Sequence, residues 1–186
     1  MSATDDTLRA NQIYSLTFSH KHLSRSPERK LAVLACMDAR IDVELILGLR
    51  VGDANVLRNA GALVTEDILR SLILSHHLLG MEEVMIVAHT GCGMLSFKDE
   101  ELKARLHDMT GAAVVSPQSF GAFANLEESV LDQIQKVRSH PWLNGLTSVR
   151  GFIYDVETGR LREVMEQSPA LSYDLPPLDT ALEEIS

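Results

Sequence analysis

Two short apolar runs most constrain how this chain can fold. Leu31–Ala35 and Val84–Ala88 consist of apolar residues without interruption. Strands buried on both faces have this pattern, because side chains on either side of the strand meet apolar neighbours. The sequence therefore predicts that both runs are interior strands of a mainly parallel sheet.

Helical patterns alternate with these strands. Thr65 is placed to cap a helix that carries Glu66 and Asp67 in its first turn and Gly80 just beyond its end. Further helices are predicted over residues 4–19, 42–49, 96–107 (opening on a Ser96–Asp99 capping box) and 122–139, and further strands over 54–57, 149–154 and 161–164. The last two strands flank a turn and form a predicted hairpin. This alternation predicts an α/β fold with a central, mainly parallel β-sheet flanked by helices.

Length and charge limit the organisation and the partners. A chain of 186 residues, 45% of them hydrophobic, suits one domain. We expect this domain over residues 1–167, with 1–30 as a helical arm and loop, and a proline-containing tail over 168–186. The net charge of −9 disfavours binding to nucleic acid or anionic membranes. The polar start and the lack of a long apolar run predict a cytoplasmic protein without a membrane span.

The two cysteines lie where polar residues follow the two apolar runs. Cys36 directly follows the first run, and His89 and Cys92 follow the second. Because parallel strands end at the same edge of a sheet, we expect these three side chains to meet. Two thiolates and one imidazole suit zinc, and three protein ligands leave a fourth position open or filled by a carboxylate. The sequence therefore predicts one Zn²⁺ per subunit.

Asp38 and Arg40 follow Cys36 at intervals of two residues. If the segment stays extended, all three side chains point the same way. Asp38 is then placed to hydrogen-bond a zinc-bound hydroxide or to bind the metal, while Arg40 grips that carboxylate with two donors. We take this pair as the catalytic dyad. Two roles stay open for Arg58 and Asn59, namely packing against the site and holding the backbone.

The pattern Cys-x-Asp-x-Arg, followed by Arg58-Asn59-Ala60-Gly61 and then His-x-x-Cys, resembles the β-class carbonic anhydrase family over residues 31–94. The resemblance implies zinc held by Cys36, His89 and Cys92, and attack of zinc-bound hydroxide on carbon dioxide to form bicarbonate. It also implies a homodimer, or a higher homo-oligomer, in which the N-terminal helix lies across the partner. The substrate is expected in an apolar pocket near Ala60 and Gly93.

Two alternative functions use the same residues. Some compact members of this family hydrolyse carbonyl sulfide or carbon disulfide, which are linear molecules like carbon dioxide. Many members carry a glutamine shortly before the first zinc cysteine, and the stretch Ser26–Lys30 has none. A carbonyl sulfide hydrolase is therefore the alternative to carbon dioxide hydration. A non-catalytic zinc or redox-sensing protein is a third hypothesis, which the Asp38–Arg40 dyad disfavours.

Overall fold

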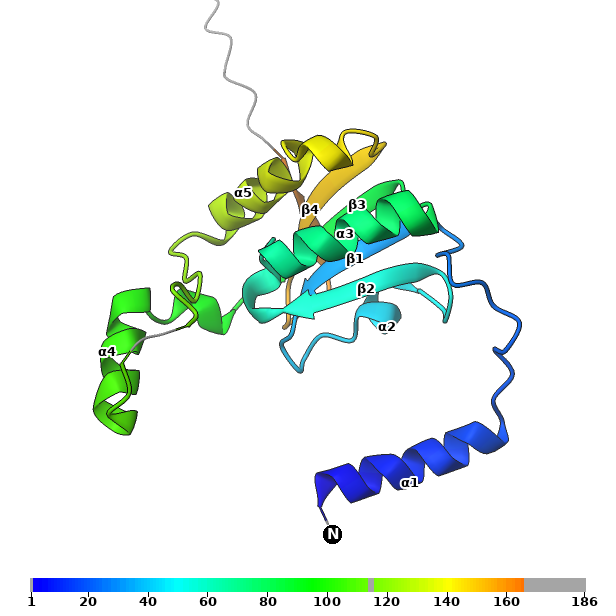
Figure 1. The fold of residues 1–186 in the computed structure, drawn as a ribbon, viewed down its shortest axis with the longest axis horizontal. Coiled ribbons are helices and arrows are strands. Elements are labelled where there is room, and N and C mark those ends of the chain that lie inside the picture. The colour runs from blue at the N-terminus through cyan, green and yellow to red at the C-terminus, as the bar shows by residue number, and fades with distance from the viewer. Residues whose placement is uncertain (1, 114–115, 166–186) are drawn as a thin grey trace, which may run out of the picture.

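A five-stranded sheet forms the centre of the molecule (Figure 1). The computed structural model describes residues 2–113 and 116–165, so the tail predicted over 168–186 lies outside the described residues. The strands lie in the order β2 (Ala54–Asn59), β1 (Leu31–Cys36), β3 (Glu83–His89), β4 (Ser148–Tyr154) and β5 (Leu161–Val164). The first four are parallel, and β5 pairs antiparallel with β4 as the predicted hairpin. The expected fold class is confirmed.

Strand β1 lies between β2 and β3 in the interior of the sheet. Its residues from Ala32 to Ala35 are completely buried, as the uninterrupted apolar run predicts. Cys36 pairs with Asn59 of β2, and Ala35 pairs with Val87 of β3. The carboxyl ends of β1, β2 and β3 therefore lie at one edge of the sheet.

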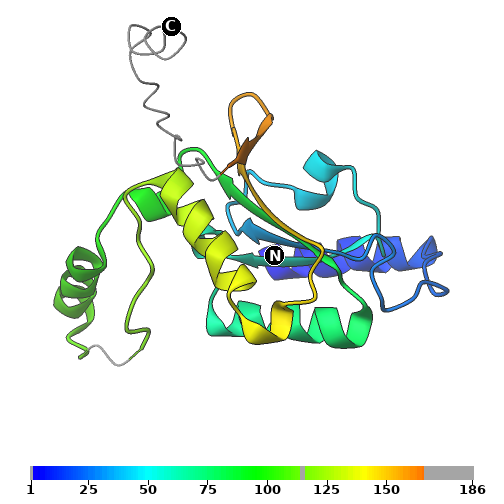
Figure 2. The ribbon, with the colours of Figure 1, turned by 90° about the horizontal axis from the view of Figure 1, so that it is seen from above.

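Helices cover both faces of the sheet (Figure 2). Helices α3 (Glu66–Leu79) and α5 (Leu126–Arg138) lie on one face, and the short helix α2 (Val43–Leu47) lies on the other. Leu72 of α3 and Val137 of α5 are completely buried. These apolar side chains hold the two long helices to the sheet.

Both predicted ends of α3 are confirmed, whereas α1 (Ala3–Leu16), α2 and α4 (Asp99–Thr110) end two or three residues from the predicted positions. Thr65 Oγ1 accepts the N–H of Ile68 at the start of α3, and Gly80 ends this helix in the left-handed conformation. The start of α5 was predicted four residues too early, at residue 122. The helix begins at Leu126, because Asn125 Oδ1 accepts the first free N–H groups and caps it there.

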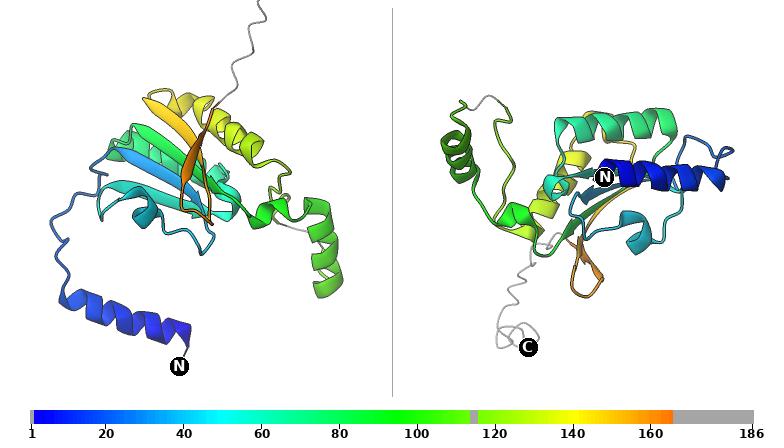
Figure 3. Two further views of the ribbon diagram at one scale, coloured as in Figure 1. Left: turned by 180° about the vertical axis from the view of Figure 1, so that it is seen from behind. Right: turned by 90° about the horizontal axis from the view of Figure 1, so that it is seen from below.

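Two helices stand away from the sheet (Figures 1 and 3). These are α1 (Ala3–Leu16) and α4 (Asp99–Thr110), and neither contains a buried residue. The capping box predicted for α4 is wrong, because Lys98 occupies the cap position without a side-chain bond to the helix. Ser96 Oγ instead donates to the carbonyl oxygen of Gly93 at 2.6 Å.

Three short 3-10 turns complete the described chain: η1 (Ala60–Ala62), η2 (Gly93–Leu95) and η3 (Pro141–Leu143). The first follows β2 and the second follows the Cys92 loop, and they contact each other at the carboxyl edge of the sheet. Within residues 2–113 and 116–165, no helix has both the length and the apolar character that a membrane span requires.

Candidate metal centre

The three predicted metal ligands meet at the carboxyl edge of the sheet. Cys36 is the last residue of β1, His89 is the last residue of β3, and a tight turn at Gly91 brings Cys92 back beside them. One candidate ligand atom from each residue lies within 4.8 Å of the other two, and all three residues are buried. Neighbouring strands and one turn thus gather two sulfur atoms and an imidazole.

The two ring nitrogens of His89 differ in their surroundings, because only one of them has a hydrogen-bond partner in the described part of the chain. Nδ1 lies 3.0 Å from the carbonyl oxygen of Thr90, which fixes the ring and directs Nε2 into the site. Nε2 is buried and has no hydrogen-bond partner among the described residues. A buried polar atom without a partner costs about 1–3 kcal/mol. Coordination of a metal ion by Nε2 removes this cost, and the bond from the other ring nitrogen is the usual support of a metal-binding histidine.

The main chain of Thr90 is itself fixed by β4 and the turn that follows it. Its N–H donates to the carbonyl oxygen of Tyr154 at 2.9 Å. Its Oγ1 accepts the N–H of Val156 at 3.1 Å. The acceptor that orients His89 is therefore anchored to the sheet rather than to a free loop.

The sulfur atoms of Cys36 and Cys92 compete for one proton. The Cys92 thiol donates to Cys36 and holds the pKa of Cys36 well below its ordinary value, with main-chain N–H groups adding to the effect. The Cys36 thiolate, together with burial, raises the pKa of Cys92. A divalent cation relieves this conflict because it binds both sulfurs as thiolates. The donor set and the unpartnered nitrogen fit zinc.

Asp38 and Arg40 form the predicted pair beside this centre. Arg40 donates from Nε to Asp38 Oδ1 at 2.9 Å and from Nη2 to Oδ2 at 2.8 Å. The main-chain N–H of Arg40 also donates to Oδ1 at 3.0 Å. These donors hold the pKa of Asp38 well below its usual range, so the carboxylate stays ionised.

The backbone around this pair differs from the expectation. The chain does not stay extended from Cys36 to Arg40, because it turns at residues 39–40 and the N–H of Ile41 donates to the carbonyl of Asp38. Arg40 still reaches Asp38, and its Nη2 also donates to the carbonyl oxygen of Gly91 at 3.2 Å. Arg40 therefore joins the loop after β1 to the loop after β3.

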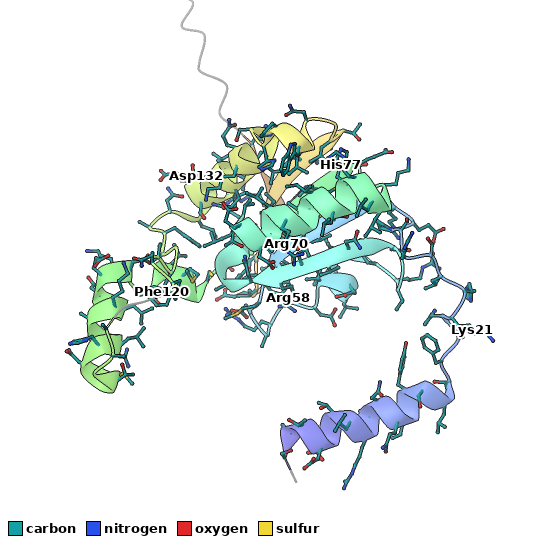
Figure 4. The ribbon with its side chains drawn as sticks, in the orientation of Figure 1. Lys21, Arg58, Arg70, His77, Phe120 and Asp132 are labelled. Carbon is teal, nitrogen blue, oxygen red and sulfur yellow. The ribbon has the colours of Figure 1, made fainter. Side chains whose placement is uncertain are left out.

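The side chains of Arg58 and Asn59 form hydrogen bonds with main-chain groups. Arg58 lies at the end of β2 (Figure 4) and donates from Nε to the carbonyl of Cys36 at 3.0 Å and from Nη2 to the carbonyl of Asp38 at 2.7 Å. Asn59 bonds both the N–H and the carbonyl of Leu63 through its side-chain amide. The question that the sequence left open is thus answered for both residues.

Ala60 and Gly93, predicted to line the substrate pocket, begin η1 and η2. Ala60 is half-buried and Gly93 is exposed. The two turns contact each other, and Gly93 directly follows the candidate ligand Cys92.

Gly61 was named from the sequence only as part of the family motif, and no role was predicted for it. Its main-chain N–H donates to Cys36 Sγ at 3.4 Å. Gly61 has a φ of 83°, and a Cβ at this position would lie 3.0 Å from Met94 Cγ and 3.2 Å from Phe123 Cε1. The glycine after a strand end was the available signal, since both its conformation and its surroundings exclude a side chain.

His76 and His77 of α3 have structural roles outside the metal centre. His76 Nδ1 lies 2.6 Å from the carbonyl oxygen of Met81. His77 Nε2 lies 2.8 Å from the carbonyl oxygen of Trp142. Each ring therefore ties its helix to a neighbouring segment.

Comparison with known proteins agrees with this geometry. A family profile described as carbonic anhydrase matches residues 31–161. The chain is 42% identical over 165 residues to beta-carbonic anhydrase 1 of Mycobacterium tuberculosis, covering 88% of this chain and 99% of that protein. It is 36% identical over 152 residues to a carbon disulfide hydrolase of Acidithiobacillus thiooxidans, covering 72% and 76%. The crystal structure of carbonic anhydrase from Streptococcus mutans superposes with a TM-score of 0.83 at 39% identity, covering 89% of this chain and 99% of that one.

Proposed function

Because this chain belongs to the β-carbonic anhydrase family, we propose that it hydrates carbon dioxide reversibly to bicarbonate, using zinc held by Cys36, His89 and Cys92. It is a zinc enzyme, as its relatives and its donor set indicate. The observation that carries the proposal is the buried, unpartnered Nε2 of His89 beside two cysteine sulfurs. Three ligands from the protein would leave one coordination position of a zinc ion open for a reactant.

Zinc bound here supplies a water molecule activated as a nucleophile near neutral pH. Asp38, which Arg40 holds beside the three ligand residues, would accept a hydrogen bond from the attacking water and orient it toward the carbon of the substrate. Arg40 is a positioning residue, since its two donors keep Asp38 ionised and fix the direction of the carboxylate. The reaction adds one water to carbon dioxide and releases bicarbonate and one proton.

The substrate is proposed to bind at the apolar surface beside Ala60 and Gly93. Both residues lack a side chain beyond Cβ, so a small linear molecule can approach the metal closely there. Their main chains belong to two turns that contact each other, which gives this surface a fixed shape.

Hydrolysis of carbonyl sulfide or carbon disulfide is the second candidate. It is favoured by the 36% identity to a carbon disulfide hydrolase. The lack of a glutamine in Ser26–Lys30 is weaker evidence for the sulfur compounds as substrates than the sequence indicated. In the structure, Glu28 and Arg29 are bonded through their main chains to Gly52 and Asp53, beside the start of β1. A strand of six residues spans about 20 Å, so this stretch does not reach the centre of its own chain.

A homodimer in which α1 covers the partner is the proposed assembly. Helix α1 buries none of its residues in its own chain, although Ile13 and Leu16 are apolar and 70% and 85% exposed. An isolated helix of 14 residues is marginally stable in water. A second copy of the chain supplies the apolar surface that this helix lacks.

Rates of carbon dioxide hydration, carbonyl sulfide hydrolysis and carbon disulfide hydrolysis on one zinc-loaded preparation test this proposal. The Cys92→Ser variant, which loses a metal ligand, serves as the blank. We expect fast hydration, with sulfide release at or near the rate of the blank. Sulfide release that exceeds hydration would make the chain a hydrolase of the sulfur compounds. Full zinc loading without either activity would leave the third hypothesis, a non-catalytic zinc protein.

A further inference from the structure

The carboxylate of Asp99 binds a segment that lies some twenty residues further along the chain. Oδ2 accepts from Ser119 Oγ at 2.5 Å, from the N–H of Phe120 at 2.8 Å and from the N–H of Gly121 at 3.4 Å. Oδ1 accepts the N–H of Ala122 at 3.1 Å. Asp99, at the start of α4, is therefore bonded to the segment that follows this helix, and Phe120 lies in that segment (Figure 4).

These bonds set the place of the residues that follow. Gly121, in the left-handed conformation, approaches Leu63 so closely that a Cβ would lie 2.5 Å from Leu63 Cδ1. The N–H of Phe123 donates to the carbonyl oxygen of Met94 at 3.3 Å. The anchored segment thus rests on the two turns that flank the metal centre, η1 and η2.

Phe123 and Met94 cover Gly61 directly. The Phe123 ring and the Met94 side chain lie 3.2 Å and 3.0 Å from the position of a Cβ on Gly61. Gly61 and the following Ala62 both have positive φ, which costs free energy at Ala62. The contacts of Phe123 and Met94 hold this strained turn in the orientation that directs the Gly61 N–H toward Cys36 Sγ.

We propose that Asp99 is a positioning residue of the metal centre, because it seats Phe123 on the Gly61 turn and thereby maintains the N–H···S bond to Cys36. The inference rests on the proposed zinc site. Hydrogen bonds to a ligating sulfur tune how much charge the sulfur gives to the metal, and support of this kind affects metal affinity by about 10–100-fold. The depressed pKa of the Asp99 carboxyl, at about 2, fits its several donors.

Asp99→Asn tests the proposal, with Asp67→Asn as the matched control. Asp67 also lies in the first turn of a helix, and its side chain is paired with Arg70. Zinc affinity is measured by competition with a chromophoric chelator. The near-ultraviolet thiolate-to-metal bands are measured on the cobalt-substituted protein, because these bands report the charge on the sulfurs.

For Asp99→Asn we expect zinc binding about tenfold weaker than in the unmodified protein, together with shifted thiolate bands. Asp67→Asn should leave both unchanged. A folded Asp99→Asn protein with unchanged affinity and unchanged bands would overturn the proposal. If Asp99→Asn does not fold, Ser119→Ala removes a single donor and decides by the same criteria, with a smaller change expected. Absence of zinc binding in the unmodified protein would instead reject the proposed function.

Discussion

His89 Nε2 lies 3.7 Å from Asp38 Oδ2. This separation is too long for a hydrogen bond, so the carboxylate stands beside the imidazole without satisfying it. Asp38 is instead bound by Arg40, and His89 keeps its buried nitrogen for the metal. The candidate ligand His89 and the proposed catalytic group Asp38 therefore do not bind each other, although both lie at the same centre.

Asp38→Asn should retain zinc and lose activity. The amide keeps the size of the carboxylate but accepts a hydrogen bond from the attacking water less well. We expect the rate of carbon dioxide hydration to fall by roughly 10²-fold to 10⁴-fold. Stopped-flow rates on samples of known zinc content check this. Asp42→Asn is the control, since asparagine replaces aspartate well as the cap of α2. Equal rates for Asp38→Asn and the unmodified protein would show that Asp38 does not direct the water.

Arg58→Lys should weaken zinc binding although it preserves the charge. The guanidinium donates to two carbonyl oxygens at once, and a single ammonium cannot reproduce that fork. We expect roughly tenfold lower zinc affinity, because the carbonyls of Cys36 and Asp38 lose a fixed partner. Arg70→Lys, which changes an exposed pair with Asp67, is the control. Unchanged affinity in Arg58→Lys would mean that the strand pairing alone holds the Cys36 loop.

Gly61→Ala and Gly48→Ala separate backbone strain from crowding. Both glycines have positive φ, so alanine costs about 1–2 kcal/mol at either position. Nothing lies within 4 Å of a Cβ at Gly48, whereas Met94, Phe123 and Leu63 crowd one at Gly61. Overpacking adds about 1–3 kcal/mol to the loss of unfolding free energy at Gly61 alone. Urea denaturation of the two variants measures the difference, and equal losses would contradict the crowding at this turn.

The pH dependence of Asp99 follows from its depressed pKa. The carboxyl titrates near 2 instead of 3.8, because Ser119 and main-chain N–H groups donate to the ionised form. Its contribution to stability is therefore complete above the unfolded pKa of 3.8 and is lost as the pH falls toward 2. The amide signals of Phe120 and Ala122, followed by NMR, should titrate with a midpoint near 2. A midpoint near 3.8 would mean that Asp99 does not hold this segment in solution.

The sequence predicted the sheet and the metal ligands because their signals are local and chemical. An uninterrupted apolar run indicates a buried strand, and the ends of parallel strands share an edge, so Cys36, His89 and Cys92 were expected to meet, and the family resemblance implied the same ligands. The Asp38–Arg40 pair was also predicted, although the turn at residues 39–40 was not.

Hydrogen bonds from main-chain donors, and those between residues far apart in the sequence, could not be predicted in this way. The N–H of Gly61 carries no side-chain signal, so its bond to Cys36 Sγ could not be read from residue types. The three-residue spacing from Ser96 to Asp99 favoured a capping box, but the Asp99 carboxylate is occupied by residues 119–122. Asp99 also holds the N–H of Ala122, and Asn125 caps α5, so the helix starts later than predicted.

X-ray absorption at the zinc edge of the purified protein tests the central claim most directly. We expect two sulfur neighbours at about 2.3 Å and two nitrogen or oxygen neighbours at about 2.0–2.1 Å, of which one is an imidazole. Cys92→Ser should lose one sulfur neighbour. A shell without sulfur, or a spectrum that is the same in Cys92→Ser, would contradict a metal centre built from Cys36, His89 and Cys92.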